Sequence, residues 1–199
     1  IRGSMAKRVE IKEKKIAFQK AIFQIDEAHL RYEKYNGQMS DEIVRLNLNR
    51  GDSAAALVYR TTDDRLAFTE QFRFSTYEKG PGWILEIPAG IVEQGEKPEV
   101  AMRRELVEEI GYEVGSLHHI NTFYLSPGGT SERIFLFYAE VTPQQKTKAG
   151  GGLVEEAEDI RTVFYTVDEA LKKMQNGEIL DAKSLIALQW LQLKRLNKK

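Results

Sequence analysis

The stretch from Gly90 to Tyr112 constrains this chain more than any other, because it marks both ends of one helix. Pro98 suits the first turn of a helix, where the missing N–H of proline costs nothing. Gly111 suits the position just beyond a helix end, where φ becomes positive. The sequence therefore predicts a helix over residues 98–110, preceded by a loop that begins at Ala89-Gly90.

Three glutamates of this helix are predicted to share one face. At about 100° per residue, Glu105, Glu108 and Glu109 fall within an arc of roughly 100°, and the apolar side chains turn to the other side. Like charges at this spacing cost about 0.2–0.5 kcal/mol per pair, which implies a counter-charge. Mg²⁺ prefers carboxylate and phosphate oxygens, so it would direct the site towards phosphoryl chemistry. A solvated acidic face is the simpler interpretation of an isolated Glu-x-x-Glu-Glu.

The wider pattern around the helix favours the metal site. It resembles the box of the Nudix superfamily, G-x5-E-x7-R-E-[apolar]-x-E-E-x-G-[apolar], at every fixed polar and glycine position. The matching residues are Gly90, Glu96, Arg104, Glu105, Glu108, Glu109 and Gly111. Tyr112 departs from the pattern, at the final aliphatic position. A match at this many fixed positions is too specific to treat as a solvated helix face.

The resemblance implies a role for each residue of the box. Glu105, Glu108 and Glu109 would bind Mg²⁺, or Mn²⁺ as a substitute, together with the backbone carbonyl of Ala89. The glycines and Arg104 would be structural, with Arg104 orienting a glutamate. For Glu96 two interpretations stay open: a further metal-associated carboxylate, or a brace for Arg104.

A second motif narrows the resemblance. Pro127 follows Gly111 by 16 residues, within Ser126-Pro127-Gly128-Gly129, and on turn chemistry alone these four residues predict only a β-turn. Their spacing from the box is similar to that of the ADP-ribose pyrophosphatases, as are residues 36–40 and 186–193. The resemblance implies hydrolysis of ADP-ribose to AMP and ribose 5-phosphate. It also implies substrate contacts through four side chains, namely Arg45, Arg73, Ser126 and Glu132.

An acidic loop after Gly150-Gly151-Gly152 is expected to supply the base that activates water. The triple glycine predicts a mobile connection that lets the loop swing over a substrate. The resemblance places the catalytic glutamate at Glu156, with Glu158 as the neighbour that substitutes for it, and Glu109 would take part in catalysis as well as in metal binding. A solvated acidic loop is the plainer alternative.

The pattern of elements predicts the α+β class, with a mixed β-sheet sandwiched between helices, the Nudix fold that the resemblance implies. Alternating apolar positions and the turn signal Asn36-Gly37 predict a long hairpin over residues 16–50. We expect three parts: residues 1–4, which resemble an expression-tag remnant; 5–50, an N-terminal antiparallel sheet; and 51–199, the hydrolase domain. In the similar enzymes the N-terminal sheet is exchanged between two subunits, so the resemblance implies a homodimer.

Composition excludes several other classes. Lys plus Arg number 29 and Asp plus Glu 30, so no overall basic field favours nucleic acid. No apolar stretch approaches the roughly 20 residues that span a bilayer, and without cysteine there is no disulfide framework. We expect a cytoplasmic protein without a membrane partner.

Alternatives within the resemblance also stay open. Residues 149–152 and 177–179 resemble GDP-mannose pyrophosphatases, which makes GDP-mannose or another nucleotide sugar the second candidate substrate. A Nudix domain that senses nucleotides without cleaving them is disfavoured, because the box carboxylates are intact. Sanitation of nucleoside triphosphates is disfavoured by the N-terminal sheet and by Pro127.

Overall fold

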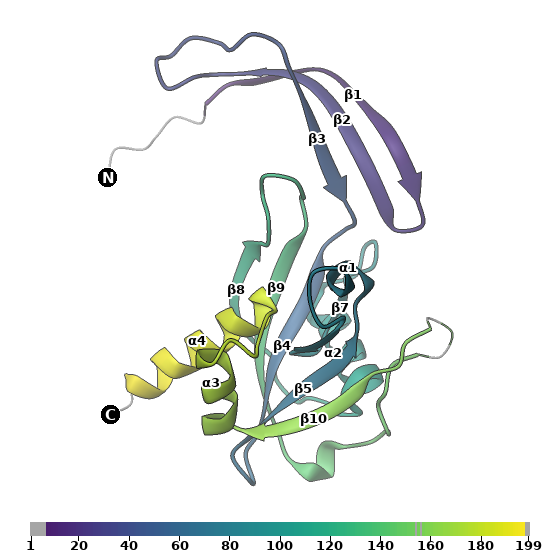
Figure 1. The fold of residues 1–199 in the computed structure, drawn as a ribbon, viewed down its shortest axis with the longest axis vertical. Coiled ribbons are helices and arrows are strands. Elements are labelled where there is room, and N and C mark those ends of the chain that lie inside the picture. Colours follow the sequence, from purple (N-terminus) through teal and green to yellow (C-terminus); the bar gives the residue numbers. More distant parts are fainter. Residues whose placement is uncertain (1–6, 154, 156, 198–199) are drawn as a thin grey trace. The chain divides into compact units, whose positions relative to one another are not determined.

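The computed structural model describes residues 7–153, 155 and 157–197 (Figure 1). They divide into two compact units. The first unit runs to Gly51 and also includes Tyr124–Glu132, and the second holds Asp52–Phe123 and the chain from Arg133 onward. Each unit is described by itself.

The first unit is an antiparallel sheet of three strands in the order β1-β2-β3. The strands are β1 (Val9–Lys20), β2 (Phe23–Tyr32) and β3 (Ile43–Asn49). The prediction of one hairpin from residue 16 is wrong in two respects. The first strand begins earlier, at Val9. The chain then turns back at Ala21, which has a φ of +50°. Glycine or asparagine usually occupies such a turn position, and neither is present at residue 21. The predicted turn at Asn36-Gly37 lies in the β2–β3 connection, and Gly37 has a φ of +80°.

The loop that contains Pro127 belongs to the same compact unit as this sheet. Leu48 N–H in β3 donates to the Gly129 carbonyl at 2.8 Å. Thr130 Oγ1 donates to the Leu48 carbonyl at 3.0 Å. The outer edge of β3 thus obtains hydrogen-bond partners from a segment about 80 residues further along the chain, which local sequence patterns do not reveal.

The second unit is built on a mixed sheet in the order β10-β5-β4-β9-β8, with β6 paired to β5 and β7 paired to β4. Its strands are β4 (Ser53–Arg60), β5 (Arg65–Phe72), β6 (Trp83–Glu86), β7 (Ala89–Ile91), β8 (His118–Tyr124), β9 (Arg133–Val141) and β10 (Arg161–Thr166). The β4–β9 pair is parallel, whereas the β10–β5, β4–β5, β4–β7 and β5–β6 pairs are antiparallel, so the predicted mixed sheet is confirmed. The sequence did not predict β7 or the short helix α1 (Phe74–Tyr77).

Helices cover both faces of this sheet (Figure 1). The helices are α2 (Pro98–Glu105), continued by η1 (Leu106–Ile110), then α3 (Val167–Gln175) and α4 (Ala182–Leu196), with a 3₁₀ turn η2 at Pro143–Gln145. Alternate side chains of β4 point to opposite faces. Ala54 and Ala56 pack with α2 and η1, whereas Ala55 and Leu57 pack with α3 and α4. The predicted sandwich of a sheet between helices is therefore confirmed.

Local capping signals in the sequence mark the starts of the two C-terminal helices. Thr166 and Glu169 form a capping box at the start of α3. Asp181 accepts the Ser184 N–H at 3.0 Å at the start of α4. Within the described residues, no helix of the length and apolarity needed to cross a membrane is found.

Candidate metal and substrate site

The carboxylate helix changes its winding where the glutamates begin. Residues 98–105 are α-helical as predicted, but Leu106–Ile110 form a π-helical turn, which is wider than an α-turn and frequent at functional sites. The turn ends at Gly111, whose φ of +78° agrees with the predicted helix end. Within this turn Glu109 is buried, with 2% of its surface exposed, and does not lie on an open polar face.

Glu109 is a buried carboxylate with little to neutralise it. Its Oε2 accepts a hydrogen bond from Ala89 N–H at 3.0 Å. Burial raises the pKa of Glu109 well above its ordinary value, and the nearby charges of Glu105, Glu86 and Glu158 raise it further, against the lowering effect of the Ala89 bond. A charge in this position therefore favours a cation beside it.

Glu105 lies against the loop that precedes the helix. A Cβ atom built on Gly90 would lie 1.9 Å from Glu105 Cδ, so only glycine leaves room for this carboxylate. Burial raises the pKa of Glu105 to about 7, although Arg104 lowers it, and the charges of Glu108 and Glu158 add to the rise. Gly90 thus brings the main chain of the loop directly onto an acidic oxygen.

Arg104 joins the acidic residues of the box. Its Nη1 donates to Glu105 at 2.7 Å and to Glu108 at 3.2 Å, and its Nη2 donates to the Ile91 carbonyl at 3.1 Å and to Glu96 at 3.3 Å. Burial opposes the charge of Glu96, but Arg104 and the Glu93 N–H together outweigh burial and lower the Glu96 pKa. The contact between Glu96 and Arg104 is the one expected of a brace.

The donor set fits a hard divalent cation. In the described part of the chain, no three Asp, Glu or His side chains converge as a ready-made metal cage, and Arg104 holds Glu105 and Glu108. The available donors are carboxylate oxygens, the ligands that Mg²⁺ and Mn²⁺ prefer. The raised pKa values of Glu105 and Glu109 mark carboxylates that lack sufficient positive charge, and the cradle at Gly90 brings the backbone close to them.

The triple glycine fastens the acidic loop to the end of the carboxylate helix. Gly151 N–H donates to the Glu109 carbonyl at 2.9 Å, and Gly152 N–H donates to the Glu108 carbonyl at 3.0 Å. Gly150, Gly151 and Gly152 all have positive φ, a conformation that favours glycine. The glycines therefore act as caps for the helix carbonyls, a role that the prediction of a mobile connection did not include.

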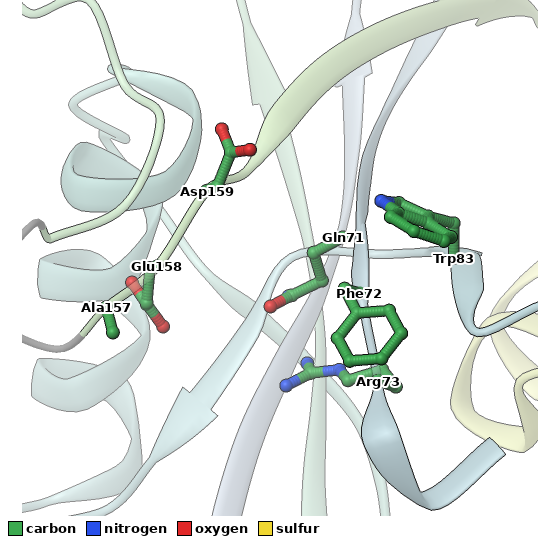
Figure 2. A pocket seen from close by; sticks show the side chains of 7 residues that line it. All are labelled: Gln71, Phe72, Arg73, Trp83, Ala157, Glu158 and Asp159. Carbon is green, nitrogen blue, oxygen red and sulfur yellow. The ribbon is translucent and has the colours of Figure 1, made fainter. Parts of the chain in front are cut away.

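The acidic loop borders a cleft of about 620 Å³. Glu158 lines it together with Arg73, Gln71 and Trp83 (Figure 2), and Glu158 Oε2 accepts the Leu153 N–H at 3.1 Å. The charge of Glu158 also contributes to the raised pKa of Glu105 and of Glu109, so Glu158 links the cleft electrostatically to the carboxylate helix. Glu156, the expected base, lies outside the described residues.

Sequence reasoning missed two buried residues at this site. Glu86, at the end of β6, accepts a hydrogen bond from Arg73 Nε at 2.7 Å and another from Lys183 Nζ on α4. A glutamate within the apolar run of residues 83–88 was the only available signal for Glu86. Lys183 gave none, because it follows the helix cap at Asp181 like an ordinary surface residue.

The remaining predicted substrate residues belong to the first unit. Arg45 in β3 is exposed, and its Nη1 donates to the Val44 carbonyl at 2.9 Å. The Ser126 carbonyl, beside Pro127, accepts two backbone N–H groups at 3.0 Å. Glu132 is buried, with 6% exposed. These residues share the unit of the N-terminal sheet, whereas the carboxylate helix and Arg73 share the second unit.

A mixed sheet between helices, with acidic side chains where one helix ends beside a glycine-bearing loop, is an arrangement that suits a hydrolase working with a divalent metal ion. The chain belongs to the NUDIX domain family, whose family model matches residues 49–188.

The chain is similar to two curated proteins of Escherichia coli (strain K12). It is 39% identical over 177 residues to an ADP-ribose pyrophosphatase, covering 87% of this chain and 83% of that protein. It is 39% identical over 150 residues to a GDP-mannose pyrophosphatase, covering 74% of this chain and 77% of that protein. A crystal structure of an ADP compounds hydrolase shares the fold, with a TM-score of 0.71 and 18% identity over 96% of this chain and 98% of that one.

Proposed function

We propose that the chain hydrolyses the diphosphate bond of ADP-ribose, giving AMP and ribose 5-phosphate, and that it does so in the cytoplasm. The observation that carries the proposal is the pair of carboxylates Glu105, which is partly buried, and Glu109, which is buried, whose charges interact with Glu158 of the cleft that contains Arg73. Acidic groups that require a cation and an arginine that suits an anion are together what a metal-bound diphosphate needs. The 39% identity to an ADP-ribose pyrophosphatase supports the choice of substrate.

The proposed metal ligands are Glu105, Glu108, Glu109 and the Ala89 carbonyl, with Mg²⁺ as the ion and Mn²⁺ as a substitute. When bound, such an ion supplies Lewis acidity to the diphosphate oxygens and to water. The protein groups hold the carboxylates in place: Arg104 orients Glu105 and Glu108, and Ala89 N–H orients Glu109.

We assign the general base to the acidic loop. Glu158 lines the cleft, and its electrostatic effect on Glu105 and Glu109 supports a place beside the reacting groups. Glu156 stays the alternative on the strength of the resemblance. A loop glutamate that accepts a proton from water contributes about 10²–10⁴-fold to a rate.

We propose a homodimer in which residues 5–50 are exchanged, so that Arg45 of one subunit serves the active site of the other. Ser126 and Glu132 are the proposed contacts on the ribose side of the substrate. The exposure of the N-terminal sheet supports a partner. Large apolar side chains on β1 and β3 are between 47% and 61% exposed: Val9, Ile11, Ile16, Phe18, Val44 and Leu46. An apolar surface of this kind usually marks a protein interface.

The alternative substrate is GDP-mannose, which the equal identity to a GDP-mannose pyrophosphatase favours. The deciding experiment compares kcat/KM for ADP-ribose and GDP-mannose at equal, saturating Mg²⁺, with AMP, GMP and sugar phosphates separated by chromatography. We expect ADP-ribose to be preferred by at least about tenfold, the effect of one well-placed polar contact in a site. A preference for GDP-mannose would overturn the choice of substrate, and no cleavage of either would overturn the proposed activity.

A further inference from the structure

Lys183 is a buried cation that belongs to neither sequence motif. It lies in the first turn of α4 and is 8% exposed. Its Nζ donates to Glu86 and lies 3.0 Å from Asp181 Oδ1. Removing an ammonium group and a carboxylate from water is costly, and an apolar pair of similar size is often at least as stable. Stability alone is therefore a weak reason for this ion pair.

Glu86 connects Lys183 to the cleft. One of its carboxylate oxygens faces Lys183, and the other accepts Arg73 Nε at 2.7 Å. Burial opposes the charge of Glu86, which is 5% exposed, but Lys183 and Arg73 outweigh burial and lower its pKa. Glu86 is thus a fixed anion held between two cations from different elements.

Arg73 is the member of this set that reaches solvent. It lines the cleft opposite Glu158, and Figure 2 shows its guanidinium extending towards the loop that carries Glu158. Within the described residues, the Arg73 side chain is held by the hydrogen bond that its Nε donates to Glu86. Its two terminal nitrogens remain oriented as a fork, which suits two oxygens of one phosphate group.

The same end of α4 also holds the segment that leads into the metal motif. Ser184 Oγ accepts the Ile87 N–H at 2.8 Å, and it donates to the Asp181 cap at 2.6 Å. Ile87 is two residues before Ala89, whose N–H binds Glu109. Lys183 therefore stands in a rigid junction between α4 and the segment 86–89.

We propose that Lys183 is a positioning residue for substrate binding: through Glu86, it fixes Arg73 so that the guanidinium is prepared for the diphosphate. This inference rests on the proposed function, in which Arg73 contacts the substrate. A guanidinium held in its binding orientation loses less side-chain freedom when the anion arrives, which strengthens binding.

The test replaces Lys183 with methionine, which retains most of the side-chain length and removes the charge. We expect KM for ADP-ribose at saturating Mg²⁺ to rise about tenfold, the effect of losing an outer-shell partner, with kcat little changed. Lys183→Arg restores the charge and is expected to return KM most of the way. The matched control, Lys173→Met, removes the surface pair with Glu178 and is expected to leave KM unchanged.

A second variant separates binding from stability, because Lys183→Met leaves the buried Glu86 with Arg73 as its remaining cationic partner and lowers the thermal unfolding midpoint. The double variant Glu86→Gln/Lys183→Met removes both charges and is expected to recover the midpoint while KM stays high. Recovery of a normal KM in the double variant, or a normal KM in Lys183→Met, would overturn the inference.

Calorimetric titration with ADP in EDTA distinguishes failure of this inference from failure of the proposed function. The parent protein is expected to bind ADP about tenfold more tightly than Lys183→Met. If the parent hydrolyses no nucleotide sugar but this difference remains, the proposed reaction is wrong and the role of Lys183 stands. Equal ADP binding by the two proteins overturns the role of Lys183.

Discussion

Glu109→Gln is expected to reduce turnover of ADP-ribose by more than about 10²-fold. Loss of a residue that only hydrogen-bonds a metal ligand already reduces metal affinity or activity by about 10–100-fold, and Glu109 is itself a proposed ligand. Glutamine has the same shape and still accepts the Ala89 N–H, but it removes the negative charge that the metal ion requires. Steady-state assays over a range of Mg²⁺ and Mn²⁺ concentrations measure the effect. Substantial activity at saturating metal would exclude Glu109 from the metal site.

The same substitution is expected to leave the metal-free protein at least as stable as the parent. The raised pKa of Glu109 means that its charged form is unfavourable in the folded state, and a neutral amide removes this cost. Thermal unfolding in EDTA compares the stability of the variant with that of the parent. Glu99→Gln, on the exposed first turn of the same helix, is the matched control and should change neither turnover nor the unfolding midpoint. A large loss of stability in Glu109→Gln would assign Glu109 a structural role.

Gly111→Ala is expected to destabilise the second unit by on the order of 3 kcal/mol, the sum of a left-handed φ forced on alanine and an overpacked contact. The new Cβ would lie 2.1 Å from the Lys148 carbonyl oxygen. Because that atom is backbone, the whole segment near Lys148 must move. This segment bonds to the Gly111 carbonyl through the Thr147 N–H at 2.9 Å and leads into the triple glycine, so turnover should fall as well.

Gly177→Ala is the control for this prediction. Gly177 follows the end of α3 with a φ of +75°, close to the +78° of Gly111, but nothing lies within 4 Å of its built Cβ. Gly177→Ala should therefore lower the free energy of unfolding only by the cost of the left-handed φ, about 1–2 kcal/mol. Thermal unfolding followed by circular dichroism compares the two variants. Equal losses would show that the packing of Lys148 against Gly111 contributes nothing.

Local signals account for the elements that the sequence predicted well. Pro98, Gly111, Thr166 and Asp181 act on neighbouring backbone groups, so their effects are readable from a few residues. The continuous apolar run of β4 similarly reflects a strand that is buried on both faces of its sheet. The box motif predicted that Arg104 contacts a glutamate of the box, because its partners Glu96, Glu105 and Glu108 lie on the same helix and the loop before it.

The features that the sequence did not reveal depend on distant partners. The π-helical turn coincides with N–H groups of Gly151 and Gly152 that bind the helix carbonyls, more than 40 residues downstream. The Glu86–Lys183 pair joins residues 97 apart in the chain. The turn at Ala21 has no glycine or asparagine to mark it. In each case tertiary contacts determine the local conformation.

The central claim is that carboxylates from one helix hold a divalent cation. Titration of Mn²⁺ followed by electron paramagnetic resonance tests it without any assay of activity, using the parent protein and the double variant Glu105→Gln/Glu109→Gln. We predict saturable Mn²⁺ binding by the parent and an affinity at least about tenfold weaker in the double variant, with Glu99→Gln behaving like the parent. Equal affinity in the parent and the double variant would contradict the account.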